Sequence, residues 1–134
     1  MKLKIIDGLP FISTRSGNRE SIQTPAEVTN DAHRLIGEAN QVILGLRNAY
    51  HEAQQRIEAA ILSGEDAAKL RAEQAAIRDE IADHERDQLE AFNRIGEVST
   101  LLDTHLADVI RKGDKARLNQ LLTPFNNFTK EYQA

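Results

Sequence analysis

The amino-acid sequence predicts a mainly α-helical protein built on a long antiparallel two-helix hairpin of the coiled-coil type. Apolar residues recur at steps of three and four over most of residues 24–112, and helix start and stop signals bracket two segments there. Aromatic residues make up only 4% of the chain, while alanine is abundant, which favours thin helix-on-helix packing over a bulky core. A small β-hairpin or meander precedes the helices, and a short helical segment follows them.

We expect a single domain over residues 1–134, because a chain of this length supports one core of modest size. Residues 1–23 are expected to form the β-hairpin or meander and residues 24–112 the helical hairpin. Residues 114–134 are expected to form the C-terminal helical segment.

Short strands with two turn signals are predicted for residues 2–23. Residues 2–5 alternate polar and apolar side chains, and Asp7-Gly8 is a common hairpin dipeptide. Residues 9–14 form a second candidate strand, and residues 19–23 a weaker third one after a turn at 16–18. So few strands are not stable alone. We therefore expect the apolar face of residues 89–110, or a second subunit, to cover them.

The first helix is predicted to begin at Thr24, which is a good N-cap, with Pro25 at the first helical position and Glu27 completing a capping box. Its apolar seam follows the spacing of a coiled coil. The predicted seam residues are Val28, Ala32, Leu35, Ala39, Val42, Leu46, Tyr50, Ala53, Ile57 and Ile61.

A turn at Ser63-Gly64 is predicted to reverse the chain, because glycine readily takes the left-handed conformation that ends a helix. The second helix then runs to Lys112, where Gly113 supplies a second stop signal. The hairpin register that follows places the pairs Ile57 with Leu70, Tyr50 with Ile77, Leu46 with Ala82, and Ile36 with Phe92 close together. Gly37 is expected to leave room for the Phe92 ring.

The C-terminal segment contains an aromatic face. Thr123-Pro124 opens a last turn or helix, in which Phe125, Phe128 and Tyr132 share one side. We expect these aromatic residues to dock on the strands and on the adjoining helix ends.

The net charge of −4 is unevenly distributed. Residues 24–109 carry eight Lys and Arg against seventeen acids, so this acidic middle disfavours binding to a nucleic acid polymer. Both termini are basic instead. If they meet, six residues form one cationic surface, the basic head, which is a candidate site for an acidic protein or a phosphate-bearing ligand. Its members are Arg15, Arg19, Arg111, Lys112, Lys115 and Arg117. Ordinary solvation of surface charges is the competing interpretation.

An oligomer interface is predicted on the first helix. The apolar stripe there is broader than one antiparallel helix covers, and the facing part of the second helix, residues 83–88, is polar. Val42 and Ile43 would then lack a complete apolar lid within one chain, so we expect a homodimer. The candidate interface residues are Leu35, Ile36, Val42, Ile43 and Leu46.

Several classes of function are disfavoured. There is no cysteine, which excludes disulfides, thiolate metal sites and cysteine nucleophiles. The histidines lack the Glu-x-x-His pattern of di-iron helices, so we expect no metal and no cofactor. Acid pairs such as Asp79-Glu80 lie on a helix surface without a cleft, so we expect no catalytic residues. No signal-peptide region and no run of about 20 apolar residues occurs, so we expect a cytoplasmic protein without a membrane partner.

The predicted function is a non-enzymatic protein–protein interaction module, such as an adaptor, assembly factor or inhibitor, that acts as a homo-oligomer. Small bacterial and phage-type proteins often have this architecture, and we expect such an origin by analogy. The alternative is an oligomeric binder or sequesterer of a small phosphate-bearing ligand, such as a nucleotide, through the basic head.

Overall fold

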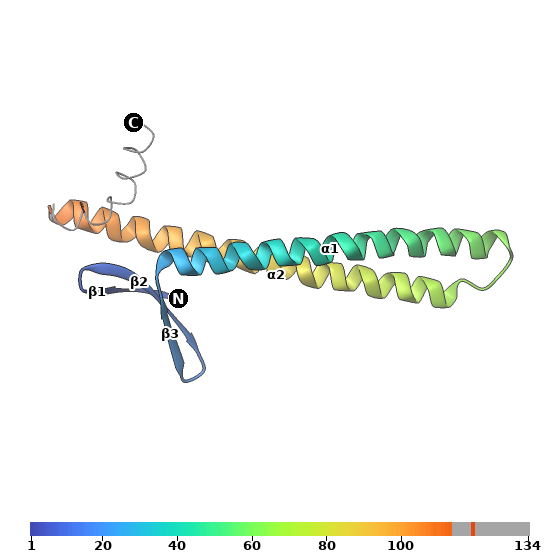
Figure 1. The fold of residues 1–134 in the computed structure, drawn as a ribbon, viewed down its shortest axis with the longest axis horizontal. Helices are drawn as coiled ribbons and strands as arrows, with labels where there is room; N and C mark the ends of the chain where they lie inside the picture. The colour runs from blue at the N-terminus through green and yellow to red at the C-terminus, as the bar shows by residue number, and fades with distance from the viewer. Residues whose placement is uncertain (114–118, 120–134) are drawn as a thin grey trace, which may run out of the picture. The chain divides into compact units, whose positions relative to one another are not determined.

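The computed structural model describes residues 1–113 and Asn119. Three strands, β1 (Lys2–Ile6), β2 (Leu9–Ser16) and β3 (Arg19–Gln23), precede two long helices, α1 (Pro25–Leu62) and α2 (Ala68–Lys112) (Figure 1). The predicted mainly α class, with a two-helix hairpin and an N-terminal meander, is confirmed. The helical segment predicted for residues 114–134 lies outside the described residues, apart from Asn119.

The chain divides into two compact units, which are described separately. The sheet unit contains Met1–Asn30 and the chain from Arg94 onward, so it holds the three strands, the start of α1 and the end of α2. The hairpin unit contains Asp31–Asn93, which includes most of both helices and the turn between them.

The sheet of the sheet unit is an antiparallel meander in the order β1-β2-β3. Two-residue turns close both hairpins, since Ile6 pairs with Leu9 and Ser16 pairs with Arg19. Asp7 and Gly8 both have positive φ angles, of 53° and 80°, as a type I′ turn requires. The second turn, at Gly17-Asn18, also lies where the sequence predicts it, and Gly17 has a positive φ of 63°.

The core of the sheet unit joins the sheet to the helices. Ile12 of β2, at 0% exposure, packs with Val28 of α1 and Val98 of α2. Leu3, Leu101 and Leu102 pack around this cluster. The expected cover of the strands by the apolar face of α2 is thus present at residues 98–102.

Local signals place the ends of α1. The Glu27 amide donates to Thr24 Oγ1 at 3.1 Å, and the Thr24 hydroxyl donates to the Glu27 carboxylate at 3.0 Å. At the other end, the Glu65 amide donates to the Ala60 carbonyl at 2.9 Å, with Gly64 at a φ of 75°. This is a Schellman motif. The Asp66 carboxylate then accepts from the Ala68 amide at 3.0 Å and caps α2.

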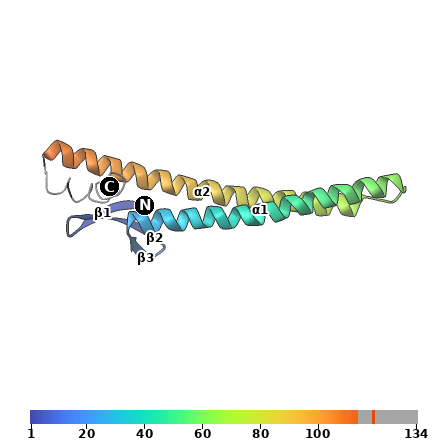
Figure 2. The same cartoon turned by 45° about the horizontal axis from the view of Figure 1, so that its top comes forward.

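In the hairpin unit, α1 and α2 run side by side in both views (Figure 1, Figure 2). Ile57 and Leu70 belong to one apolar cluster beside the turn, as the predicted register requires. Further along, Gln74 donates to Gln54 at 2.8 Å, and the Gln88 amide group donates to the Ile36 carbonyl at 3.1 Å. These cross-links confirm an antiparallel pairing close to the predicted one.

The α1 seam agrees with the prediction in part: Val28, Ala32, Ala39, Ala53 and Ile57 are buried as expected. The prediction also includes Leu35, Val42, Tyr50 and Ile61 in the seam, but all four side chains are exposed. The buried residues of α1 in this unit are Ala32, Ala39, Ile43, Ala53, Ile57 and Ala60. Compared with the predicted orientation, α1 is turned about its axis so that Ile43, rather than its neighbour Val42, faces α2. Steps of three and four leave this choice open, because both phases contain apolar residues.

The expected packing of Phe92 over Gly37 is wrong. Phe92 is 55% exposed, and a Cβ atom added at Gly37 would meet no atom within 4 Å apart from its own neighbours along the helix. The adjacent Ala91 is buried instead. The smaller side chain lets the helices approach closely and turns the larger ring outward.

Candidate functional site

Four members of the basic head are described, and all four lie in the sheet unit. Arg15 is on β2, Arg19 begins β3, and Arg111 and Lys112 end α2. Lys115 and Arg117 lie outside the described residues.

Arg111 and Lys112 share one acidic partner. Asp108, one turn earlier on α2, forms ion pairs with the Arg111 guanidinium and with Lys112 Nζ, the latter at 3.0 Å. Hydrogen bonds from Lys112 and Arg111 hold the pKa of the Asp108 carboxyl below its ordinary value. Much of the positive charge at this helix end is therefore balanced by a carboxylate of the same chain.

Arg15 lies in a separate cavity of about 250 Å³ on one face of the sheet. The strand register places the side chains of Lys2, Lys4, Ser13, Arg15 and Glu20 on this face, opposite to Ile12. Glu20 forms an ion pair with Lys4 and accepts a hydrogen bond from the Ser13 hydroxyl at 2.6 Å. Arg15 and Arg111 line different cavities, and Lys2 borders both.

The Glu20 carboxylate predicts a pH dependence of the sheet. The hydrogen bond from Lys4, followed by the one from Ser13, lowers the Glu20 pKa from its ordinary value. A carboxyl group whose pKa is lower in the folded state stabilises the fold at any pH above its ordinary, unfolded-state pKa. This stabilisation is lost as the pH falls through the folded-state pKa. Glu20→Gln should therefore lower the melting temperature at pH 7, and the difference from the unmodified chain should shrink as the solution is made more acidic. A loss of melting temperature that does not change with pH would show that the charge of Glu20 does not stabilise the sheet.

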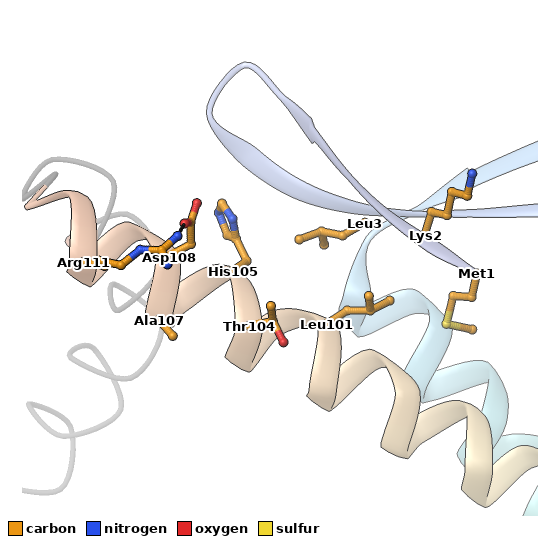
Figure 3. A pocket seen from close by; sticks show the side chains of 9 residues that line it. All are labelled: Met1, Lys2, Leu3, Leu101, Thr104, His105, Ala107, Asp108 and Arg111. Carbon is orange, nitrogen blue, oxygen red and sulfur yellow. Dashed lines mark hydrogen bonds and ion pairs between the residues drawn. The ribbon is translucent and has the colours of Figure 1, made fainter.

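A larger cavity of about 810 Å³ lies between the start of β1 and the last turns of α2 (Figure 3). Its apolar lining includes Leu3 and Leu101, and its polar lining includes Thr104, Asp108 and Arg111. His105 points from α2 toward β1, and its Nε2 atom is buried with no hydrogen-bond partner in the described structure. A buried polar atom without a partner costs free energy, so this atom requires an explanation.

Sequence reasoning did not identify this cavity. The available signal was His105 among the apolar residues Leu102, Leu106 and Val109, which places a polar side chain on an apolar helix face. The pairing of that face with β1 depends on residues far apart in the chain.

The predicted oligomer interface lies in the hairpin unit, and one premise of its prediction is wrong. Ile43 is only 4% exposed, because α2 covers it within the chain. Ile36 and Leu46 are half-buried. Leu35 and Val42 remain exposed, at 42% and 44%, and they lie seven residues apart on one side of α1.

The hairpin unit has small residues inside and large ones outside. Six of its eight buried hydrophobic residues are alanine, and the other two are Ile43 and Ile57. Eight large hydrophobic side chains in the same unit are exposed. They are Leu35, Val42, Leu44, Tyr50, Ile61, Leu62, Leu89 and Phe92. Single exposed apolar residues are ordinary, but the hairpin unit exposes as many large apolar side chains as it buries hydrophobic residues.

Metal ligands do not gather in the part of the chain that the structure describes: no group of three or more His, Asp or Glu residues is positioned to hold an ion. Neither described helix has a stretch long and apolar enough to span a membrane.

Comparisons with protein-family models, with curated proteins and with solved structures each find no match to this chain.

Proposed function

We propose that the protein is a non-enzymatic interaction module that associates with itself through the helical hairpin and, in that state, acts as an adaptor, assembly factor or inhibitor in the cytoplasm. The observation that carries this proposal is the placement of apolar side chains in the hairpin unit: alanines are buried between the helices, and larger apolar side chains are exposed.

Packing between hairpins supports the proposal energetically. Fully burying a leucine or valine side chain contributes about 1.5–3 kcal/mol, and Leu35 and Val42 leave nearly half of their surface exposed. Alanine seams let two helices approach closely but bury little apolar area. A second hairpin laid along the flank of the first would complete a four-helix bundle with a core of ordinary size.

The alternative of a small phosphate-bearing ligand has weaker support. A ligand anion at Arg111 and Lys112 of the basic head would compete with the Asp108 carboxylate, which already pairs with both. Arg15 and Arg111 also line different cavities.

Leu35→Glu tests the proposed association. A charge at the centre of an apolar interface should raise the dissociation constant by about tenfold or more, because it removes apolar burial from both copies of a two-fold contact. Light scattering coupled to size exclusion measures the resulting loss of molar mass, and circular dichroism checks that the helices persist. Asn48→Glu is the matched control, since it adds the same charge at an exposed polar position of α1. Equal molar masses for the two variants would contradict the proposed interface.

A further inference from the structure

Strand β1 forms one edge of the sheet, and no other described strand pairs with its outer side. In a two-residue hairpin the closing pair exchanges hydrogen bonds, so Ile6, Lys4 and Lys2 direct their amides and carbonyls toward β2. The amides and carbonyls of Leu3 and Ile5 consequently point away from the sheet. This edge therefore offers hydrogen-bonding groups to the backbone of one more strand.

One face of this edge is cationic. Lys2 and Lys4 share that face, and both line the cavity of about 250 Å³ together with Arg15. The described lining of this cavity contains a single acid, Glu20, which already pairs with Lys4. The three cations are thus only partly balanced by this acid. A carboxylate placed beside Lys2 would therefore gain an attraction across the strands.

The opposite face of β1 is apolar. Leu3 and Ile5 lie on it, and Leu3 lines the larger cavity together with Leu101 of α2 (Figure 3). Ile5 retains 36% of its surface exposed, so apolar area remains to be covered there. Successive side chains of an added strand would lie on alternate faces, one cationic and one apolar.

We propose that β1 binds an extended segment of a partner protein in which acidic and apolar residues alternate. The backbone of this segment pairs with Leu3 and Ile5. Its carboxylates lie on the face of Lys2 and Lys4, and its apolar side chains lie on the opposite face. Backbone pairing supplies affinity, and the two faces of the edge select the sequence.

A second copy of β1 fits this edge poorly. The antiparallel register that pairs all five residues of β1 with those of another β1 places Lys4 opposite the Lys4 of that copy. Like charges directly opposite each other destabilise a sheet, and lysine on an edge strand opposes pairing between copies. The same lysines attract carboxylates, so they favour an acidic partner over a second copy.

This inference goes beyond the proposed self-association and does not rest on it. Strand β1 belongs to the sheet unit, whereas the exposed apolar side chains proposed for self-association belong to the hairpin unit. Peptide binding and molar mass are separate measurements, so failure of one proposal leaves the other standing.

Fluorescence anisotropy tests the charge preference of the edge. The probe is a fluorescein-labelled peptide of alternating glutamate and valine, titrated with the full chain. It should bind, and a peptide of alternating lysine and valine should bind about tenfold more weakly or less, because its charges repel those of Lys2 and Lys4. Lys2→Glu should weaken binding of the glutamate–valine peptide by about fivefold or more, since a repulsion replaces an attraction. Lys69→Glu is the matched control, because it makes the same change of charge at an exposed position of the hairpin unit and should leave the dissociation constant unchanged.

Two methylated peptides test the backbone pairing. In an extended strand the glutamate amides point to one edge and the valine amides to the other, so N-methylation of one residue type removes the hydrogen-bond donors of one edge only. One methylated peptide should bind like the unmethylated probe, and the other should bind about tenfold more weakly or less, because only one of its edges faces β1. This comparison needs no substitution in the protein, so it decides the case even if Lys2→Glu unfolds the sheet. Equal binding of the two methylated peptides, no binding of the unmethylated probe, or equal effects of Lys2→Glu and Lys69→Glu would overturn the proposal.

Discussion

Ile12→Ala is expected to lower the free energy of unfolding by about 2–5 kcal/mol, the usual range for truncating a fully buried isoleucine. Ile12 has no exposed surface and joins β2 to Val28 of α1 and Val98 of α2. Removing three carbon atoms at this junction leaves a cavity between three elements that cannot all move to fill it. Urea denaturation at a fixed protein concentration measures the change.

Ile22→Ala is the matched control for that substitution. Ile22 lies on the edge strand β3 and is 46% exposed, so the same truncation should change the free energy of unfolding by only about 0.5 kcal/mol. A loss at Ile12 no larger than the loss at Ile22 would contradict the docking of the sheet on the two helices.

Ile43→Glu is expected to have the other large effect, destabilising the folded hairpin by more than about 3 kcal/mol. The side chain of Ile43 is 4% exposed in the seam, so a carboxylate placed there would lose most of its hydration. Thermal unfolding followed by circular dichroism measures this loss.

Val42→Glu tests which of the two neighbouring residues lies in the seam. It introduces the same charge as Ile43→Glu, but on the exposed flank of α1. It should leave the free energy of unfolding of the single chain within about 0.5 kcal/mol while weakening association. Comparing Val42→Glu with Ile43→Glu therefore distinguishes an effect on association from an effect on folding. If Val42→Glu unfolded the hairpin and Ile43→Glu did not, the seam would follow the phase containing Val42.

Most of the fold could be predicted because its signals are local. The turn at Asp7-Gly8, the capping box of Thr24 and Glu27, and the stop at Gly64 each depend on residues a few positions apart. The helix register followed from the turn at Gly64, since an antiparallel hairpin fixes which residues face each other, as Ile57 and Leu70 do.

The candidate surfaces were harder to predict because they depend on which side of α1 faces α2 and on contacts between residues far apart in the sequence. Whether Val42 or Ile43 faces α2 depends on the rotation of α1 about its axis by one residue position. Both are large apolar residues, so hydrophobicity alone does not decide which one is buried. Close helix packing favours the phase with alanine at the contacts. The cavity at His105 required β1 and the end of α2 to meet, which are separated by about a hundred residues in the sequence.

The molar mass of the unmodified full chain tests the central claim most directly. Self-association through the apolar flanks predicts a dimer or a dimer-based assembly by light scattering at tens of micromolar, with dissociation on dilution. A mass of 15.0 kDa, that of a single chain, throughout this concentration range would contradict the account.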